Sequence, residues 1–335
     1  MIPSSEEGGR LGTARAAAVD IGTNSVRLLV AEVRGSRESP ALKTLQRRMA
    51  ITRLGEGVDE SGELSEEAVE RTLEALRRYR ELADRESVTV RVAAATSAAR
   101  DALNAGPFLS AAAGILGTVP AVLGGREEAA LSFLGATYDL GPLRPADSPV
   151  LVFDIGGGST EIIAGRDGEI LLDRSIDVGC VRMSERFLRS DPPARAELEA
   201  MDGYLEGVMF PMAKELERLG AGLVVGLAGT VTTLAGLSMG LEEYDGEAIH
   251  HSRLGRGEVE EIFARLVSLT LAERKSLMRL EPGRADVIVG GTAVLRALVR
   301  AAGCEEVLVS EKDILDGLAL AAALGIPPLG KSPGG

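Results

Sequence analysis

The sequence predicts an α/β protein built from two domains of similar fold, and three observations lead to this prediction. Short apolar segments that are typical of buried strands alternate with helical segments along the chain. One construction occurs twice: an apolar strand, Asp-Ile-Gly, a small polar turn and a second apolar strand, in "AAAVDIGTNSVRLLVAEV" and in "VLVFDIGGGSTEIIAGRD". The aspartates of the two copies, Asp20 and Asp154, are 154 − 20 = 134 residues apart, a spacing that fits a duplicated domain.

The first domain is expected over residues 14–140, after a flexible leader at 1–13. A helix is expected after Ser65, because this residue is a typical N-cap, Glu66 and Glu67 occupy the first turn, and apolar residues then recur with helical spacing. The expected elements, in chain order, are strands at 16–20, 26–33 and 41–52, the helix after Ser65, a strand at 88–95, helical segments broken near Gly106 and Pro107, a strand in "TVPAVLGG" and a helix in "REEAALSFLGATYDL".

The second domain is expected over residues 148–326. The segment "GPLRPADSP" at 141–149 has the Pro, Gly and Ser content of a linker, and residues 327–335 are expected to form a flexible tail. The expected elements are strands at 150–154 and 160–165, a tight turn at 166–168, a strand in "EILLDRSIDV", a helical stretch at about 180–219, a strand at 222–229 followed by a helix, a late strand at 305–311 and a final apolar helix from about Asp313 to Leu324. That final helix is a candidate to pack back on the first domain.

The composition narrows the class of partner. The formal charge of −13 argues against broad binding to nucleic acid or to an anionic membrane, and the chain has no run of about 18 apolar residues that would span a membrane. Cys180 and Cys304 lie far apart and match no metal-ligand spacing, so we expect two reduced thiols and a cytoplasmic protein. The acidic surface and the final apolar helix are compatible with a homodimer.

The two repeated turns have the composition of phosphate-binding loops. Glycine allows the backbone to approach a ligand with no Cβ in the way, and successive N–H groups in a tight turn form a concavity that binds anions. Short hydroxyl and amide side chains add donors. The residues expected to hold phosphate are Gly22, Thr23, Asn24 and Ser25 in the first turn, and Gly156, Gly157, Gly158, Ser159 and Thr160 in the second.

Carboxylates lie beside both turns, where they would repel phosphate unless a cation lies between them. Mg²⁺ prefers one or two carboxylates together with phosphate oxygens and water. Asp20, Asp154 and Glu161 are therefore predicted to associate with Mg²⁺ or Mn²⁺, directly or through water. The alternative is that both turns are ordinary hairpins with capping aspartates, but two copies with an acid after a buried strand make that alternative weak.

Two further segments are candidates for the same site. In "GLAGTVTTLAG" a strand ends before a helix, which places Gly229 and Thr230 at a helix N-terminus that is suited to an anion. In "GGREEAALSF" Glu127 and Glu128 begin a helix, and the helix dipole is an adequate reason for both acids. A carboxylate in this position could also orient and deprotonate a water that attacks phosphorus.

Five segments occur in the order typical of the exopolyphosphatase / guanosine pentaphosphate phosphohydrolase family: "AAVDIGTNSVRLLVAEV", "AATSAARDALNAGPFL", "LGGREEAALSFLGA", "VFDIGGGSTEIIAG" and "VSEKDILDGLAL". The chain resembles this family over about residues 14–325. The resemblance implies two actin-like (ribonuclease H-like) domains with an interdomain cleft, as in actin, Hsp70 and the sugar kinases. It also implies hydrolysis of a terminal phosphoanhydride with release of orthophosphate.

The resemblance further implies roles for individual residues. Glu128, the second acid of "GREEA", matches the family glutamate that activates water. Asp154 and Glu161 match a metal-associated pair, residues 20–25 match the first phosphate loop, and Arg100 matches an arginine that faces the substrate phosphates. Many members carry extra C-terminal domains that help to grip long polyphosphate. This sequence resembles the short two-domain members, which leaves the preference for long chains open.

Several alternatives remain at this point. Polyphosphate and guanosine pentaphosphate present the same terminal phosphoanhydride, so the sequence does not separate these two substrates. An ATP-dependent small-molecule kinase, or a nucleotide-sensing or filament-forming scaffold, would use the same phosphate turns. Arg182 is either a phosphate contact or a surface residue, and Arg284 with Asp286 is a candidate structural ion pair. His250 and His251, the only histidines, are expected at the surface or at an interface rather than at a metal ion.

Overall fold

The computed structural model describes residues 11–326 apart from 24, 38, 167 and 279–281. The chain divides into two compact units. Unit 1 runs to Leu140 and resumes at Ile314, whereas unit 2 is the continuous segment Gly141–Asp313. The final helix therefore belongs to the first unit, although it follows the second unit in the chain.

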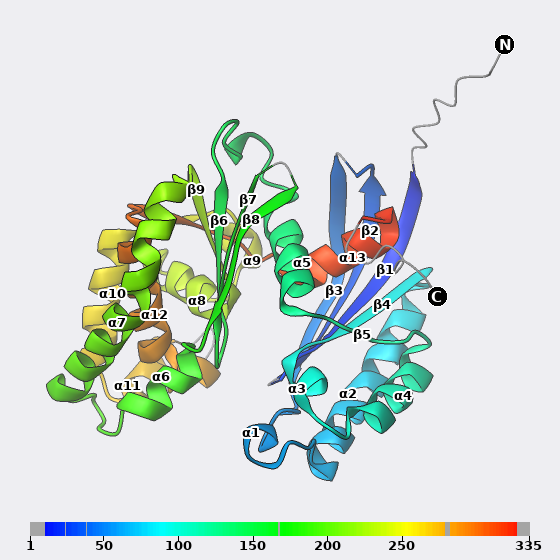
Figure 1. Ribbon diagram of the computed structural model, residues 1–335, viewed down its shortest axis with the longest axis horizontal. Coiled ribbons are helices and arrows are strands. Elements are labelled where there is room, and N and C mark those ends of the chain that lie inside the picture. The colour runs from blue at the N-terminus through cyan, green and yellow to red at the C-terminus, as the bar shows by residue number, and fades with distance from the viewer. Residues whose placement is uncertain (1–10, 24, 38, 167, 279–281, 327–335) are drawn as a thin grey trace. The chain divides into compact units, whose positions relative to one another are not determined.

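Unit 1 is built on a five-stranded sheet with the order β3-β2-β1-β4-β5 (Figure 1). Its first three strands form an antiparallel meander, and its last two run parallel to β1. The strands are β1 (Leu11–Ile21), β2 (Ser25–Gly35), β3 (Pro40–Ile51), β4 (Val90–Ala95) and β5 (Ala121–Val122). This order is that of the ribonuclease H-like sheet, so the prediction of an actin-like unit is confirmed.

Helices cover both faces of this sheet because β1 is apolar on both sides. Ala17 and Val19 face one core, shared with α2 and α4, while the alternate residues Ala16 and Ala18 face a second core, shared with α5 and α13. The helices of unit 1 are α1 (Val58–Ser61), α2 (Glu66–Arg85), α3 (Ser97–Asp101), α4 (Ala105–Leu116), α5 (Gly125–Thr137) and α13 (Ile314–Leu324).

Unit 2 repeats the same sheet with one strand added. Its order is β10-β11-β9-β6-β7-β8, in which β6, β7 and β8 are antiparallel and β9 and β11 continue parallel to β6. The strands are β6 (Val150–Ile155), β7 (Thr160–Arg166), β8 (Glu169–Ile176), β9 (Leu223–Leu227), β10 (Arg253–Gly255) and β11 (Glu306–Val309). The expected duplication is thus visible in the topology of the two sheets.

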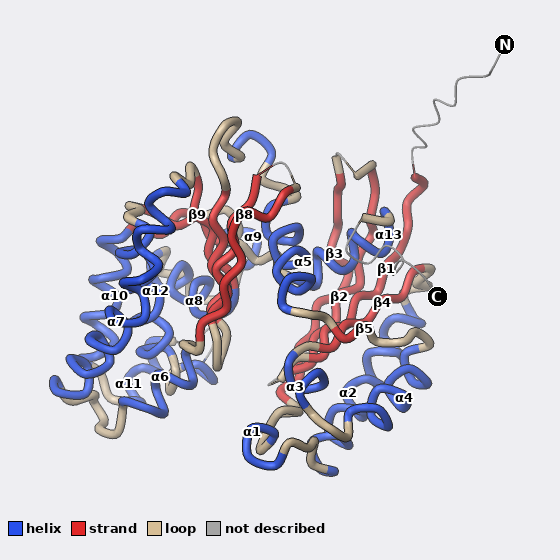
Figure 2. The backbone as a smooth tube through the Cα atoms, viewed as in Figure 1, coloured by secondary structure: helices blue, strands red, loops and turns tan. Residues whose placement is uncertain are grey.

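The main core of unit 2 lies between this sheet and a layer of helices. Leu151, Phe153 and Ile155 of β6 face that core, and Figure 2 shows α7, α8, α10 and α12 on one side of the strands. The helical segments are η1 (Gly141–Leu143), α6 (Cys180–Phe187), α7 (Arg195–Leu219), α8 (Ala228–Ser238), α9 (Gly246–Ile249), α10 (Arg256–Ser268), α11 (Leu271–Leu277), η2 (Pro282–Arg284) and α12 (Ile288–Ala302).

The final helix, α13, completes the second core of unit 1. Leu315 and Leu318 are fully buried there, and Asp316, also fully buried, pairs with Arg47 of β3. A Cβ added at Gly317 would lie 1.9 Å from the carbonyl oxygen of Leu131, so α13 and α5 approach each other at backbone distance. Burial inside unit 1 accounts for the apolar character of α13, and a homodimer would therefore need another surface.

The structure differs from the sequence prediction in several segments. Gly106 and Pro107 lie inside the first turn of α4 rather than at a break, because proline is tolerated where the helix needs no N–H donor. The strand expected in "TVPAVLGG" keeps only two residues in β5, and β10 was not expected at all. The helical stretch at 180–219 is interrupted at 188–194. The turn at 166–168 includes residue 167, which lies outside the described residues.

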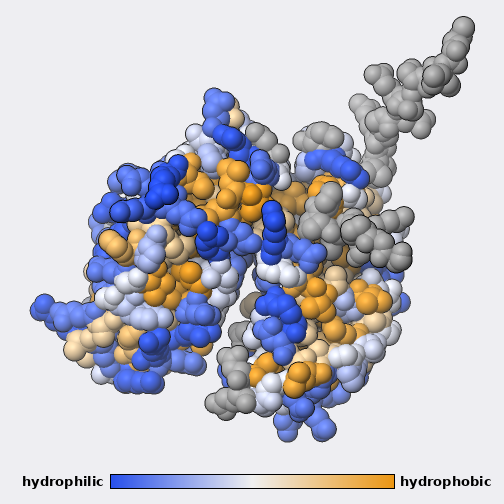
Figure 3. All heavy atoms as spheres, viewed as in Figure 1, coloured by the Kyte–Doolittle hydropathy of each residue, from blue (hydrophilic) through white to orange (hydrophobic). Residues whose placement is uncertain are grey.

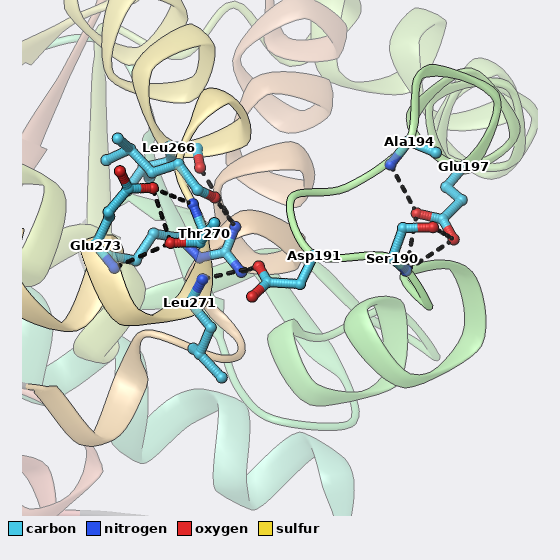
Figure 4. A network of polar contacts seen from close by, with 10 residues as sticks. Ser190, Asp191, Ala194, Glu197, Leu266, Thr270, Leu271 and Glu273 are labelled. Atoms are coloured by element: carbon cyan, nitrogen blue, oxygen red, sulfur yellow. Dashed lines mark hydrogen bonds and ion pairs between the residues drawn. The ribbon is translucent and has the colours of Figure 1, made fainter.

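The loop between α6 and α7 is fixed by side-chain carboxylates (Figure 4). Glu197 accepts from the backbone N–H of Ser190 at 3.0 Å. Asp191 accepts from the backbone N–H of Leu271 at 2.7 Å and pairs with Arg274 at 3.4 Å. Because Arg274 is buried, these contacts tie the loop firmly to the start of α11.

Candidate functional site

The predicted site residues of unit 1 lie at the carboxyl ends of three parallel strands. The backbone N–H of Thr96, just after β4, donates to Ile21 at the end of β1 at 3.2 Å. The N–H of Leu123, just after β5, donates to Ala95 of β4 at 3.0 Å. The first glycine turn, the start of α3 and the start of α5 are therefore brought to one edge of the sheet, the edge where open α/β sheets bind ligands.

The first glycine turn is closed by its own backbone and held by neighbouring segments. The N–H of Gly22 donates to Ser25 at 3.0 Å, and a Cβ at Gly22 would lie 3.0 Å from that same carbonyl oxygen. The hydroxyls of Thr23 and Ser97 are 2.8 Å apart, and Gly55 donates its N–H to Thr23 at 2.9 Å. Asn24, also predicted to bind phosphate, lies outside the described residues.

Asp20, the predicted metal-associated acid of this turn, is buried and pairs with Arg27. The two residues face each other in register on β1 and β2. Arg27 donates to Asp20 Oδ2 from Nε at 3.0 Å and from Nη2 at 2.7 Å. The arginine balances the charge of the Asp20 carboxylate, and an association of Asp20 with a metal ion stays a prediction.

Arg100 and the two glutamates of α5 lie around the end of β5. Arg100 donates from Nη1 to the carbonyl of Leu123 at 3.1 Å, directly before the turn that begins α5. Glu127 accepts from the backbone N–H of Gly124 at 3.0 Å and thereby caps its own helix. The structure therefore gives Glu127 a part in starting α5, whereas the role of Glu128 stays a prediction.

The predicted residues of unit 2 lie at the corresponding edge of its sheet. β6 and β9 are parallel and in register from Val150 with Leu223 to Asp154 with Leu227, so the glycine loop after β6 and the turn after β9 end side by side. The loop after β6 is closed by a hydrogen bond of 3.0 Å from the N–H of Gly156 to Ser159.

The start of α6 packs against this glycine loop. The sequence analysis did not anticipate this contact. The N–H groups of Cys180 and Val181 donate to Gly156 and Gly157 at 3.0 and 2.9 Å. A Cβ at Gly179 would lie 2.4 Å from the carbonyl oxygen of Gly157, so only glycine leaves room for the loop. The sequence signal was the Val-Gly-Cys that follows β8, but a single glycine between a strand and a helix is common in α/β proteins and does not indicate a contact with another loop.

Asp154 and Glu161 stand directly opposite each other on β6 and β7. Two like charges in this arrangement destabilise a sheet, and burial raises the pKa of the Glu161 carboxyl above its ordinary value. Within the part of the chain that the structure describes, Glu161 bonds to hydroxyl groups and pairs with no basic side chain. Such a pair of oxygen donors is suited to a divalent cation.

Two serines orient the Glu161 carboxylate. Ser159 donates to Oε1 at 2.8 Å, and Ser175 of β8 donates to the same oxygen at 3.0 Å. Ser175 was not anticipated, because its position opposite Glu161 depends on the register of β7 and β8. Thr160 is different: it is fully buried and donates its hydroxyl to Val178 at 2.5 Å, inside the unit.

The third glycine turn lies at the start of α8 and carries backbone strain. Ala228 has a φ of 64°, a left-handed conformation that is uncommon for a residue with a side chain, and strain of this kind is typical of functional sites. The guanidinium of Arg284 rests on Gly229, since a Cβ built there would lie 1.9 Å from its Cζ. Thr230 is buried beside Gly291. Arg284 is thus placed at the turn, which the sequence did not indicate.

Arg182 and the histidines are also located by the structure. Arg182 donates from Nε to the carbonyl of Gly158 at 2.8 Å, so its guanidinium lies along the glycine loop. His250 and His251 are half-buried with ring centroids 3.9 Å apart. Arg182 is also exposed on α6, so it lies beside the glycine loop and at the surface, and its contact with phosphate stays a prediction.

A model of the Ppx/GppA phosphatase family matches residues 29–324. The chain belongs to this family. It is 42% identical over 319 residues to a protein of Mycobacterium tuberculosis named exopolyphosphatase 2, covering 92% of this chain and 98% of that one. A bifunctional 3-dehydroquinate synthase/phosphatase of Fusobacterium nucleatum is 34% identical over 316 residues, which are 91% of this chain and 46% of that protein.

Solved structures of the family share the fold. The Ppx/GppA family member of Aquifex aeolicus aligns with a TM-score of 0.80 and 31% identity, covering 94% of this chain and 99% of that one. An exopolyphosphatase from Cytophaga hutchinsonii aligns with a TM-score of 0.80 and 27% identity, covering 93% and 98%. Among the described residues of this Ppx/GppA protein, no helix has both the length and the apolar character needed to cross a membrane.

Proposed function

We propose that this protein removes terminal orthophosphate from inorganic polyphosphate. The observation that carries the proposal is the cross-strand pair of Asp154 and Glu161 beside the glycine loop at 156–158. Two adjacent carboxylates next to an anion-binding turn are suited to hold a divalent cation between them and a bound phosphate. The 42% identity to a protein named exopolyphosphatase 2 supports polyphosphate as the substrate class.

The acids of unit 2 fit Mg²⁺, or Mn²⁺ in its place. Asp154 and Glu161 offer oxygen ligands on one face of the sheet. Glu161 is buried and has no basic partner among the described residues, so a nearby cation would stabilise its ionised form. When bound, the ion would neutralise charge on the terminal phosphoryl group. Ser159 and Ser175 keep the Glu161 carboxylate in one orientation for this purpose.

Backbone N–H groups and arginines hold the phosphate oxygens. In unit 1 these are the turn at 22–25 and Arg100, and in unit 2 the loop at 156–159 and the N-terminus of α8 at Gly229. Arg182 and Arg284 add positive charge beside the two turns of unit 2. Thr160 and Thr230, whose side chains are buried, shape the loops from within.

Glu128 is the general base of the proposed reaction. Its carboxylate accepts a proton from water while the water oxygen forms a bond to the terminal phosphorus. The bond from that phosphorus to the bridging oxygen breaks, and its electron pair leaves with the shortened chain. Glu127 does not take this role, because its carboxylate is engaged in capping α5.

Paired substitutions test the assignment of the base. Glu128→Gln is expected to lower the rate of phosphate release from polyphosphate by about 10²- to 10⁴-fold, the usual contribution of a general base. Glu127→Gln is the matched control, and it should keep both the rate and the fold, because a glutamine side chain can still accept from the N–H of Gly124. A folded Glu128→Gln protein with the wild-type rate would exclude Glu128 as the base.

One other substrate and one other reaction are alternatives to the proposed function. Guanosine pentaphosphate presents the same terminal phosphoanhydride, and an ATP-dependent kinase would use the same turns. Phosphate release from short polyphosphate, long polyphosphate and guanosine pentaphosphate should be compared with Mg²⁺ present, together with transfer from ATP to an added alcohol or carboxylate. Transfer from ATP without release from polyphosphate would replace the hydrolase by a kinase.

We also place the protein in the cytoplasm, as a homodimer. Cys180 and Cys304 are both free thiols, as is usual in a reducing compartment. The homodimer requires a surface other than α13, whose apolar residues are buried in unit 1.

A further inference from the structure

Unit 2 carries a groove between α7 and α12 that no step of the proposed reaction uses. Its volume is about 290 Å³. In Figure 3, the face in view shows groups of hydrophobic residues at the surface between hydrophilic ones. The residues that line the groove come from the two helices alone: Asp202, Leu205, Glu206, Met209, Phe210 and Ala213 from α7, and Ala293, Arg296, Ala297, Arg300 and Ala301 from α12.

The groove exists because one helix presents small side chains to the other. Ala293, Ala297 and Ala301 recur every four residues and therefore lie on one face of α12. Their methyl groups do not fill the space opposite Leu205 and Met209 of α7, and a hollow with apolar walls remains.

A large apolar side chain stands beside this hollow. Phe210 is 77% exposed, although its neighbour Met209 is buried in the core. Removing such a side chain from water is favourable. The same face of unit 2 thus carries an apolar projection and, next to it, an apolar hollow.

The rims of the groove carry opposite charges. Glu206 of α7 is exposed and, among the described residues, forms no ion pair. On α12, Arg300 gives Nη2 to Glu260 at 2.8 Å and retains further N–H groups for a second acceptor. Arg296 donates to Glu260, and its Cζ lies 3.9 Å from the centroid of the Phe263 ring. These two contacts hold its side chain in place at the wall of the groove.

We propose that this α7–α12 face is the surface through which two copies of the chain associate. A two-fold axis between the projection and the hollow brings Phe210 of each copy into the groove of the other, because an isologous interface repeats every contact. The same axis sets Glu206 of each copy opposite Arg300 of the other. The face complements itself in shape and in charge, which favours a second copy over an unrelated partner.

The size of the face is sufficient for such a dimer. α7 has 25 residues and α12 has 15. At about 1.5 Å per residue and about 10 Å of width per helix, the two cover roughly 600 Å² in each copy. Stable interfaces bury about 600–1,000 Å² per partner. The inference gives a surface to the proposed homodimer and is independent of the catalytic roles proposed above.

The test is the sedimentation of the full chain over a range of concentrations. One chain has a mass of 35.0 kDa, so the wild-type dimer is expected to sediment with a mass of 2 × 35.0 = 70.0 kDa. Phe210→Glu is expected to raise the dissociation constant at least about 30-fold, as for a central anchor of an interface. Leu103→Glu is the matched control, because Leu103 is 87% exposed in unit 1, and it should leave the dissociation constant unchanged.

A second substitution examines the hollow itself. Ala297→Leu places a larger side chain in the groove and is expected to weaken the dimer while Phe210 stays intact. A wild type that remains monomeric, a Phe210→Glu protein that dimerises normally, or an Ala297→Leu protein with unchanged affinity would each overturn the proposal. Phosphate release should continue in monomeric Phe210→Glu, which separates a failure of this inference from a failure of the proposed hydrolase.

Discussion

The substitution Gly179→Ala tests the link between the start of α6 and the phosphate loop. The backbone of Gly179 has φ −151° and ψ 169°, which alanine adopts without strain, so only the added Cβ matters. That atom would lie 2.4 Å from the carbonyl oxygen of Gly157 and 2.7 Å from the nitrogen of Gly158. Since such contacts are essentially never closer than 3.0 Å, the loop must shift by at least 3.0 − 2.4 = 0.6 Å.

This shift has two expected effects of different size. Overpacking of this kind costs about 1–3 kcal/mol of unfolding free energy, so the protein should remain folded at the assay temperature. A misplacement approaching 1 Å at a positioning loop lowers the rate by about 10²-fold. Phosphate release from polyphosphate with Mg²⁺, measured beside urea unfolding, gives both quantities.

The control is Gly114→Ala in α4, where the added Cβ meets no atom within 4 Å. This exchange is expected to raise stability by about 0.5–1 kcal/mol through helix propensity and to leave phosphate release unchanged. A Gly179→Ala protein that is folded and releases phosphate at the wild-type rate would refute the reasoning, because the loop would then not depend on its support by α6.

Three further predictions concern acids and their partners. Burial raises the pKa of Glu161, so without a divalent cation its ionisation destabilises the fold as pH rises above about 4.5. In urea at pH 8, Glu161→Gln should therefore be more stable than the wild type. This difference should disappear toward pH 4 and should decrease when Mg²⁺ is added. Ser175→Ala removes one hydroxyl from Glu161, and the Mg²⁺ concentration that gives half of the rise in melting temperature should increase about 10-fold; an unchanged midpoint would count against a supporting role. Asp191→Asn should lower the free energy of unfolding in urea by about 1 kcal/mol, since Asp191 is half exposed and its pair with Arg274 is partly screened. Asp191→Ala also loses the bond from the N–H of Leu271 and should lower this free energy further. Two variants as stable as the wild type would show that neither contact matters.

The parts of the fold that the sequence predicted are those with a local signal. Asp20 and Asp154 sit in repeated patterns of strand, glycine turn and strand, and each pattern became the central hairpin of a sheet. The pairing of Asp154 with Glu161 follows from the same pattern, because a short turn fixes the register of the two strands.

The remaining parts depend on contacts between distant segments. Gly179 supports the loop at 156–158 only because α6 folds back under it, and Ser175 meets Glu161 only through the register of a third strand. Arg284 reaches Gly229 from a segment more than fifty residues away. No periodicity or spacing encodes such meetings, so one sequence did not distinguish these residues from ordinary surface positions.

The division of Glu127 and Glu128 illustrates a different limit. Both acids satisfy the helix dipole equally well in the sequence. Only the geometry at Gly124 shows that the Glu127 carboxylate accepts from the backbone N–H that precedes its own helix. Where two neighbours carry the same chemistry, side-chain contacts rather than composition separate their roles.

The placement of α13 in unit 1 also has a consequence for synthesis on the ribosome. Unit 2 is one uninterrupted segment, Gly141–Asp313, and all of it is available for folding before α13 has been translated. Unit 1, although it begins first, exposes the apolar surface formed by Ala16, Ala18 and Leu29 until Ile314–Leu324 arrives. The domain that starts the chain is therefore the last to close, and a transcript cut short before residue 314 would yield a product with half of that core uncovered.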